Sequence, residues 1–383
     1  MPQFHFNKIL VACLVLLLVA TACFQSVRFT DVEQAKSTPI PLNLITQDVE
    51  VVENPLSGTR LDCPVMNGVN ALTAWAKLDY SNVQYINIIE SDSRGRMWLA
   101  TDGHGLTMFD GKEWHNWQPE TRKDMSYDAL RTMAVSDKYV YAGAYGSSEG
   151  GNLLIYDIEN DKWKTITPHP HALNGNVIGG LAISPSGEVF MATQYSINVY
   201  GDIPWRQIQL PNRPEFLMFM VEDALFDHEG NYWLATSQST GVWRYDGKSW
   251  TTFTAQKGDL PSNSVNALAV DSKNRIWAAT VNGLSVYDGT WHTFSVEKYP
   301  WFEGWLLDVE VDSQDRVWVV DRDEITVFNG TKIAVFTPDL VSDPLWGDTI
   351  GFDQSGCAWI DGFSGLAILR EEVTLTPGVY EFK

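Results

Sequence analysis

Short runs of apolar residues, separated by polar turn residues, repeat along most of the chain. Seven times an acidic or small residue begins a turn and an aromatic residue then opens an apolar run, first from Asp92 to Trp98 and last from Asp353 to Trp359. These aromatic residues follow one another at intervals of 41 to 49 residues, and they are Trp98, Tyr141, Phe190, Trp233, Trp277, Trp318 and Trp359. The pattern predicts short β-strands grouped into seven repeats.

A second turn lies inside most of these repeats. Pairs such as Asp110-Gly111 and Asn329-Gly330 favour tight hairpins, because glycine accepts the positive φ that such turns require. Another aromatic strand follows most of these turns, at Trp114, Trp163, Trp205, Trp250 and Trp291. Each repeat therefore holds four short antiparallel strands, which we name a, b, c and d.

Four-stranded units at a nearly constant spacing are typical of a β-propeller. The predicted fold is all-β, with seven blades of four antiparallel strands. A β-sandwich or a solenoid is the alternative, but the even grouping into fours favours the propeller. Strand b is apolar on both sides of its pleat, as in Trp233 to Thr236, which fits a blade covered on both faces. We expect an N-terminal strand within Asn70 to Tyr80 to complete the last blade and close the ring.

The segments from Ile89 to Leu106 and from Asp259 to Asp271 resemble the two-component regulator propeller repeat. The resemblance extends from about Gln84 to Arg370 and is weakest in the second repeat. It implies a sensor-type propeller outside the cell, of a kind often attached to histidine kinases and often sensing carbohydrate fragments.

The N-terminus resembles an export signal. Lys8 precedes an apolar run from Ile9 to Ala20, which is too short for the ~20 residues that span a bilayer as a helix. Ala20 to Cys23 resembles a bacterial lipoprotein signal, so we expect Cys23 to carry a lipid and the protein to reach the cell envelope. The alternative is an ordinary signal peptide cleaved near Ala22.

The resulting division of the chain has three parts. Residues 1–22 are predicted to be the signal peptide, residues 23–62 a flexible tether and residues 63–383 the propeller. Beyond the signal, Cys63 and Cys357 either pair as a disulfide across the last blade or stay as separate buried thiols.

The negative net charge limits the kinds of partner that the protein is expected to bind. With 27 Lys and Arg against 48 Asp and Glu, the formal net charge is −21. No basic run is present in the sequence, which argues against nucleic acid as a partner. Contact with a membrane is expected through the lipid anchor alone.

The loops between d and a and between b and c share one face of a propeller, and they are the most varied segments here. We expect ligand contacts on this face, because binding residues favour loops held by a rigid scaffold. Roughly two to four of its aromatic residues are expected to be exposed, the others packing the loops onto the ring. The aromatic residues of this face are Trp117, Tyr145, Tyr195, Phe216, Phe219, Tyr299, Trp301, Phe302, Trp305 and Trp346. The candidate ligand contacts among them are Trp117, Tyr145, Tyr195, Trp301, Trp305 and Trp346.

Acidic residues gather on the same face. Counting five residues back from each turn residue gives Glu222 and Asp348, with Asp223 and Asp308 one position later in their repeats. Two further acids, Asp321 and Asp361, end strand b in the last two repeats. They predict an acidic channel mouth that attracts cations or basic groups and repels polyanionic glycans, or else a set of hydrated polar groups without a ligand.

The sequence predicts binding without catalysis, with no catalytic residue, no metal and no cofactor. The expected partner is a glycan, a peptide or another envelope protein. One alternative is a propeller lyase or hydrolase acting on a polysaccharide, since His104, His169 and His171 lie in the loops of this face. Another is a scaffold that assembles envelope proteins through the same loops. No spacing typical of a catalytic triad or a metal site supports the enzyme alternative.

Overall fold

The structure is a computed structural model, and the described residues all belong to the compact unit Pro41–Lys383. They are listed here in order: 44–45, 50–52, 56–61, 63, 75–77, 85–147, 150–166, 177–193, 196–201, 205–210, 220–237, 240–294, 299–302, 304–322, 324–336, 347–362, 366–369, 371–373 and 375. The predicted signal peptide and Cys23 lie outside them.

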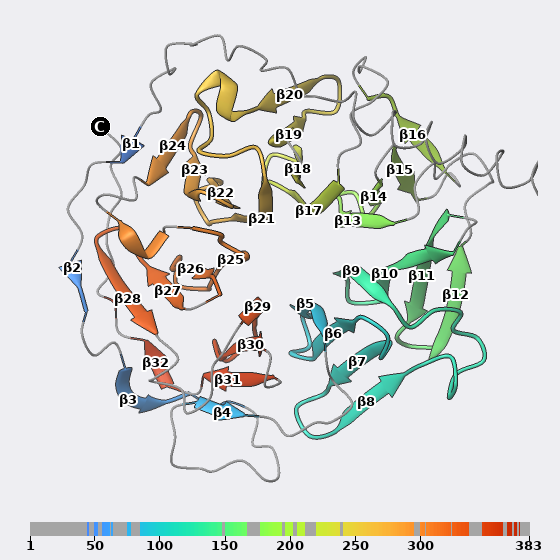
Figure 1. Ribbon diagram of the computed structural model, residues 1–383. Helices are drawn as coiled ribbons and strands as arrows, with labels where there is room; N and C mark the ends of the chain where they lie inside the picture. Colours follow the sequence, from blue (N-terminus) through green and yellow to red (C-terminus); the bar gives the residue numbers. More distant parts are fainter. Residues whose placement is uncertain are drawn as a thin grey trace, which may run out of the picture. The chain divides into compact units, whose positions relative to one another are not determined.

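Seven sheets of four antiparallel strands form the blades of a propeller (Figure 1). The first three blades are β5(Ile86–Ser91), β6(Met97–Thr101), β7(Leu106–Phe109) and β8(Trp114–Trp117); β9(Leu130–Val135), β10(Tyr139–Ser147), β11(Gly150–Asp157) and β12(Lys162–Ile166); and β13(Ile178–Ile183), β14(Val189–Thr193), β15(Ile197–Tyr200) and β16(Arg206–Ile208). The next two are β17(Met220–Phe226), β18(Tyr232–Ser237), β19(Val242–Tyr245) and β20(Trp250–Phe253); and β21(Val265–Val270), β22(Ile276–Thr280), β23(Gly283–Tyr287) and β24(Trp291–Phe294).

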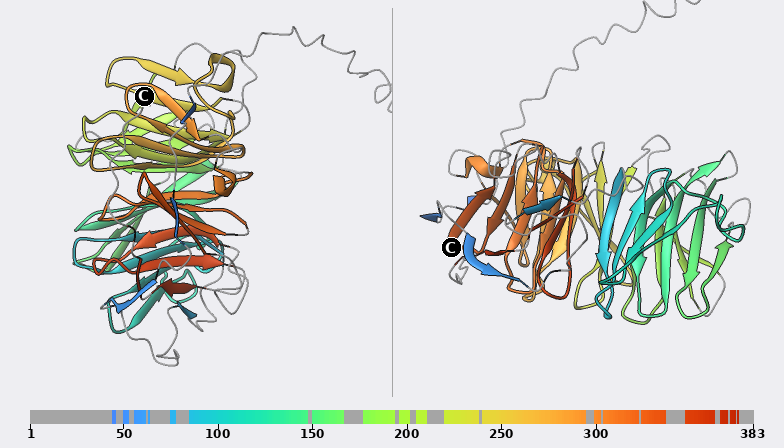
Figure 2. Two further views of the ribbon diagram at one scale, coloured as in Figure 1. Left: turned by 90° about the vertical axis from the view of Figure 1, so that its left-hand side faces the viewer. Right: turned by 90° about the horizontal axis from the view of Figure 1, so that it is seen from below.

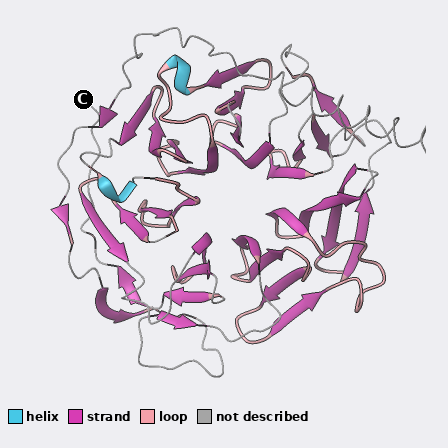
Figure 3. Cartoon of the chain, in the orientation of Figure 1, coloured by secondary structure: helices cyan, strands magenta, loops and turns pink. Residues whose placement is uncertain are grey.

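The last two blades are β25(Asp308–Val311), β26(Val317–Val320), β27(Ile325–Phe328) and β28(Lys332–Phe336); and β29(Gly347–Phe352), β30(Ala358–Gly362), β31(Ala367–Leu369) and β4(Trp75–Lys77). Among the described residues, the helical segments are the short 3-10 turns η1(Ala255–Lys257) and η2(Pro300–Phe302) (Figure 3). Figure 2 shows the blades from two further sides, with the strand ends at the two faces of the ring. The prediction of a seven-bladed all-β propeller is confirmed.

An N-terminal strand closes the ring, as predicted. Strand β4 runs antiparallel to β31, pairing Trp75 with Leu369 and Lys77 with Ala367. The innermost strand of every blade contacts that of the next, in the order β5, β9, β13, β17, β21, β25, β29 and back to β5. The last blade thus joins strands from both ends of the described chain, so it cannot form until the C-terminal repeat meets the N-terminal strand.

Part of the segment predicted as a tether pairs with the propeller. Strands β1(Leu44–Ile45) and β2(Glu50–Val51) run parallel to the outer strands β24 and β28, and β3(Leu56–Arg60) pairs with β32(Glu371–Val373). Outer strands offer unpaired backbone groups to such additions. Pieces of two residues are too short to show a period in the sequence. For the rest of residues 23–62 the tether stays a prediction.

One repeated interaction holds five of the blades together, and we call it the Asp–Trp clasp. The turn aspartate accepts two backbone N–H groups on Oδ1, and its Oδ2 accepts the indole N–H of the tryptophan that opens strand b. In blade 5, Asp271 accepts from Lys273 N and Arg275 N at 3.0 Å each and from Trp277 Nε1 at 3.0 Å. The five pairs are Asp92–Trp98, Asp227–Trp233, Asp271–Trp277, Asp312–Trp318 and Asp353–Trp359, at 2.8 to 3.0 Å.

The clasped tryptophans are fully buried and pack against the following blade, as Trp318 does beside Ile350 of blade 7. Blades 2 and 3 lack the clasp, since Ser136 and Ser184 replace the aspartate and Tyr141 and Phe190 replace the tryptophan. In blade 3 the Ser184 hydroxyl accepts a single backbone N–H, from Glu188 at 3.0 Å. The repeat is therefore held less tightly in two neighbouring blades.

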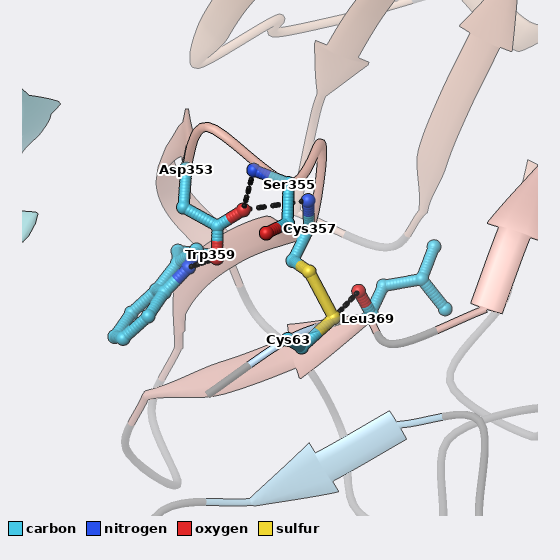
Figure 4. Close-up of a disulfide and its surroundings, with 6 residues drawn as sticks. All are labelled: Cys63, Asp353, Ser355, Cys357, Trp359 and Leu369. Atoms are coloured by element: carbon cyan, nitrogen blue, oxygen red, sulfur yellow. Dashed lines mark hydrogen bonds between the residues drawn. A yellow bond between two sulfur atoms is a disulfide. The ribbon is translucent and has the colours of Figure 1, made fainter. Parts of the chain in front are cut away.

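A disulfide joins Cys63 to Cys357 in the last blade (Figure 4), with 5.9 Å between their Cα atoms. Cys357 lies in the clasp turn, where its backbone N–H donates to Asp353. The Cys63 sulfur lies 3.8 Å from the carbonyl oxygen of Leu369 on β31. The bond therefore ties the chain before β4 to the blade that β4 completes.

Candidate functional site

The start of the innermost strand is distorted in most blades, at one face of the ring. In six blades the pairing between strands a and b shifts register there, leaving one or two residues of strand a in a bulge. The equivalent residues at the bulges are Asn87, Arg131, Gly179, Glu222, Asn266 and Asp348. Bulges of this kind re-aim side chains and are common beside functional sites.

The bulges surround a cavity of about 330 Å³ in the middle of the ring. Its lining comes from strand a of all seven blades and is rich in carboxyl groups. Those groups are Glu90, Glu222, Asp223, Asp308, Glu310 and Asp348. Four of them were predicted from spacing, while Glu90 and Glu310, two residues before the turn, were not singled out.

Three of the carboxylates hold neighbouring blades together. Asp223 of blade 4 accepts the backbone N–H of Leu268 in blade 5 at 2.8 Å. Asp308 of blade 6 accepts from Ile350 N of blade 7 at 2.9 Å and from Thr349 Oγ1 at 3.0 Å. Glu90 of blade 1 accepts from Val135 N of blade 2 at 3.0 Å. The primary role of these three carboxyl groups is structural, because each accepts a backbone N–H from the innermost strand of the next blade.

Burial dominates the electrostatics of the channel. It raises the pKa of Glu90 to about 8, with the bond from Val135 opposing and the charge of Asp223 adding to the shift. It raises the pKa of Asp223 to about 6 and holds the pKa of Glu310 well above its usual range, where Asp308, Asp223 and Glu90 repel its charge. Glu90 therefore keeps its proton near neutral pH, and the channel is less negative than its composition suggests.

An ion pair crosses one side of the channel mouth. Arg131 of blade 2 reaches over blade 3 and donates to Glu222 of blade 4. Blade 3 contributes no side chain at this level, because it carries Gly179 and Gly180. A Cβ on Gly179 would lie 1.9 Å from the carbonyl oxygen of Val221, so the close approach of blades 3 and 4 requires glycine. Glu222 is thus neutralised. Arg131 was missed because the position was compared only in the five repeats with a full-length aspartate turn, which do not include blade 2.

The other side of the mouth carries three exposed groups of different chemistry, which we call the mouth triad. They are Trp305, Arg322 and Asp348. The Trp305 side chain is 52% exposed, and the Arg322 guanidinium lies 5.0 Å from the centre of its ring. Burial raises the pKa of Asp348, and the positive charge of Arg322 opposes part of that rise. The sequence predicted Trp305 and Asp348, whereas Arg322 was missed although it directly follows the predicted Asp321.

The other predicted aromatic residues whose side chains the structure describes pack inside the ring. Trp117 was predicted to contact ligand, which is wrong: its side chain is 7% exposed and stacks on Trp98 with ring centres 5.9 Å apart. Tyr299 and Phe302 are buried, and Trp301 is partly buried against the same core. The structure describes only the backbone of Tyr145, and Tyr195 and Trp346 lie outside the described residues.

The two acids at the ends of strand b have local structural roles. Asp361 is buried and accepts the backbone N–H of Ile86 at 3.1 Å, linking blade 7 to blade 1. Asp321 accepts the backbone N–H of Glu324 at 2.7 Å and so caps the turn between β26 and β27. Asp361 is therefore part of the ring closure, although the sequence placed it at the ligand site.

No preformed metal site is present in the part of the chain that the structure describes. There, no three His, Cys, Asp or Glu side chains converge closely enough to hold a metal ion. Nor does any helix among these residues have the length and apolar character needed to cross a membrane.

Comparison with known proteins supports the repeat family and the fold. The two component regulator propeller model matches residues 259–282, which confirms the recognised repeat within blade 5. No curated protein matches the chain.

Three solved structures illustrate the similarity. The extracellular domain of the putative hybrid two component system BT3049 from B. thetaiotaomicron is 16% identical with a TM-score of 0.58, over 76% of this chain and 40% of that one. A catalytically inactive virginiamycin B lyase from Staphylococcus aureus, with quinupristin, is 12% identical with a TM-score of 0.61, over 77% of this chain and 98% of that one. YCF48 from Cyanidioschyzon merolae is 15% identical with a TM-score of 0.57, over 78% and 99%. At these identities the likeness establishes the fold alone.

Proposed function

We propose that this protein is an extracytoplasmic binding propeller of the sensor type, anchored through a lipid on Cys23, that recognises a neutral or cationic glycan or peptide without transforming it. The repeat matched in blade 5 and the extracellular sensor domain among the similar structures support this class. The ligand would lie on the face where the d-to-a and b-to-c loops meet, over the channel mouth.

The mouth triad is the observation that carries the proposal. Trp305 presents an exposed flat ring, and such rings stack on the apolar faces of sugars and on peptide side chains. Arg322 can donate to hydroxyl or carbonyl oxygens beside that ring, and Asp348 can accept from hydroxyl or amine groups. Below them the cavity of about 330 Å³ is within the size range of small-ligand sites.

The deep carboxyls support binding rather than chemistry. Glu90, Asp223 and Asp308 each accept a backbone N–H of the next blade, so their lone pairs already serve the ring. A general acid or base must reach the substrate proton directly or through one water molecule. Asp348 is exposed at the mouth, and no histidine is among the described residues that line the cavity.

A propeller lyase or hydrolase is the second candidate function. It is favoured by one observation, the raised pKa values of Glu90 and Asp223 in a channel, because shifted carboxyls near neutral pH are common at catalytic centres. If the protein turns over a polysaccharide, Asp348→Asn will abolish the activity, while a pure binding protein shows no turnover with any array ligand.

Binding is tested by a glycan and peptide array followed by thermal-shift titration of each hit. Trp305→Ala should weaken the ligand about 10-fold or more, because a stacked ring contributes on the order of 1 kcal/mol or more. Arg322→Gln should weaken it to a smaller extent. The matched control is Lys248→Gln, an exposed cation in the c-to-d turn of blade 4, on the opposite face. Equal affinity of Trp305→Ala and wild type would remove the mouth triad as the site.

The anchor is tested separately. Cys23→Ser should move the protein from the detergent-extracted membrane fraction to the soluble envelope fraction and remove the lipid mass from the mature N-terminus. A wild-type N-terminus without lipid would exclude the anchor and leave the binding proposal untouched.

A further inference from the structure

A second cavity, of about 350 Å³, opens between blades 2 and 3, away from the channel lining. At five of the seven blade junctions a clasped tryptophan fills the space toward the next blade. In blade 2 Tyr141 stands at that place, packed beside Ile178 and Leu181 of blade 3. The smaller ring and the absent clasp leave this junction open.

Two cross-strand rows of blade 2 form one wall of the cavity. Tyr139 pairs with Asp157, and Asp157 pairs with Lys162. In the parallel row Tyr141 pairs with Ile155, which pairs with Lys164. Side chains of residues paired in this way lie on the same face of a sheet. Each of the two rows therefore places a tyrosine on β10 and a lysine on β12 on either side of a residue of β11.

Tyr200 of blade 3 forms the facing wall. The Lys164 ammonium donates to its hydroxyl at 3.3 Å and lies 5.7 Å from its ring centre. Tyr139 and Tyr200 are both partly exposed, and Lys162 and Lys164 are exposed. The cavity therefore offers two aromatic rings, with the Lys164 ammonium over the ring of Tyr200 and both lysines within reach of solvent.

The charge of this cavity is opposite to that of the molecule. Two lysines line it against one aspartate, whereas the whole chain carries −21. The channel mouth repels anions, but this junction attracts them. Flat rings favour a sugar or an aromatic ligand. Asp157 favours the sugar, because its carboxylate can accept hydrogen bonds from hydroxyl groups, which an aromatic acid lacks or has few of.

We propose that the junction of blades 2 and 3 is a second binding site, for a small acidic saccharide that carries a carboxylate on its ring. The ring stacks against Tyr139 and Tyr200, the carboxylate meets Lys162 and Lys164, and hydroxyl groups donate to Asp157. A volume of about 350 Å³ suits one or two sugar rings. This site is separate from the mouth triad and does not depend on it.

The test is calorimetric titration of the full chain with a galacturonate disaccharide, a neutral galactose disaccharide and 4-hydroxybenzoate. We expect the galacturonate disaccharide to bind more tightly than the galactose disaccharide and more tightly than 4-hydroxybenzoate. The double substitution Lys162→Gln and Lys164→Gln should weaken it about 10-fold or more, because charge-assisted hydrogen bonds are lost. Raising the salt from about 0.05 to about 0.5 M should weaken it too.

Two controls keep the test decisive. Tyr141→Trp restores the larger ring of the other junctions and should abolish binding while the melting temperature stays level or rises. Lys248→Gln and Asp348→Asn should bind the disaccharide as wild type does, which separates this site from the channel mouth. Absence of binding to wild type, equal binding of the neutral disaccharide, or preference for 4-hydroxybenzoate would each overturn the proposal.

Discussion

Blades 1, 4, 5, 6 and 7 carry the Asp–Trp clasp, and blades 2 and 3 do not. In a clasped blade such as blade 5, the aspartate satisfies two backbone donors and the indole, and Arg275 adds an ion pair to its Oδ2. In blade 3 the hydroxyl of Ser184 accepts one backbone N–H, that of Glu188, where the aspartate would accept two. The unclasped pair is also where a glycine pair replaces side chains at the channel and where the second cavity opens. The comparison indicates that the clasp provides stability, and that its loss in two adjacent blades makes room for other chemistry.

The largest loss of stability should come from removing the tryptophan that fills a clasped junction. Trp277→Ala removes a fully buried indole, and we expect a loss of about 3–5 kcal/mol in unfolding free energy. Tyr141→Ala, at the open junction, should cost about half as much, because a cavity already adjoins it. Chemical denaturation of both variants measures the difference. Equal losses would contradict the distinction between the two kinds of junction.

The disulfide comes next. Because it closes a long loop, with Cys63 and Cys357 separated by 294 residues, reduction should destabilise the propeller by roughly 3–5 kcal/mol. Reducing and non-reducing melts of wild type, with Cys63→Ser as the control that no longer responds to reductant, measure this. Peptide mapping that finds both thiols free would contradict the bond.

A channel carboxyl should make stability depend on pH. Burial raises the pKa of Glu90 from its ordinary 4.5 to about 8, so the native state keeps a proton that the unfolded state releases between those values. The contribution is fully present below about pH 4.5 and is lost as the pH rises through about 8.

Glu90→Gln keeps an acceptor for Val135 and removes the titration. The variant should gain on the order of 2 kcal/mol over wild type at pH 8 and little at pH 5. Denaturation at both pH values checks this, with Asp246→Asn in an exposed turn as the control. A gain that is the same at both pH values would contradict a buried, titrating Glu90.

The smallest effect belongs to an unclasped turn. Ser184→Ala removes one hydroxyl that accepts from Glu188 N, and the cost should be about 1 kcal/mol. Asp271→Ala, its counterpart in blade 5, should cost several times more, because it leaves buried donors without an acceptor. Similar losses in the two variants would show that the clasp adds little to the turn.

The sequence alone predicted the seven repeats on which the comparison of blades rests. The intervals between Trp98 and Trp359 predicted the number of blades, and the resemblance to the known repeat was weakest in the second repeat. The absence of the clasp from blades 2 and 3 was not predicted. Residues 44–51 were read as tether because strands of two residues carry no period. The paired backbone edges that hold them belong to blades far along the chain.

The site was predicted in part, for physical reasons. Counting back from the turn found Glu222 and Asp348, since every blade repeats the same bulge. Arg131 was missed because its partner stands two blades away, and a spacing within one repeat cannot show that. Trp117 was misassigned because the spacing does not show which way a tryptophan at the end of strand d points. It stacks on Trp98 of its own blade and lies beside Tyr156 of blade 2.

The most direct test of the central claim is an NMR spectrum of the indole N–H groups, recorded while a hit from the glycan and peptide array is titrated in. The Trp305 resonance should move with ligand concentration, because its ring is exposed at the mouth. The five clasped indoles, each bonded to an aspartate, should stay in place. A Trp305 resonance that stays fixed at saturating ligand would contradict binding at the mouth triad.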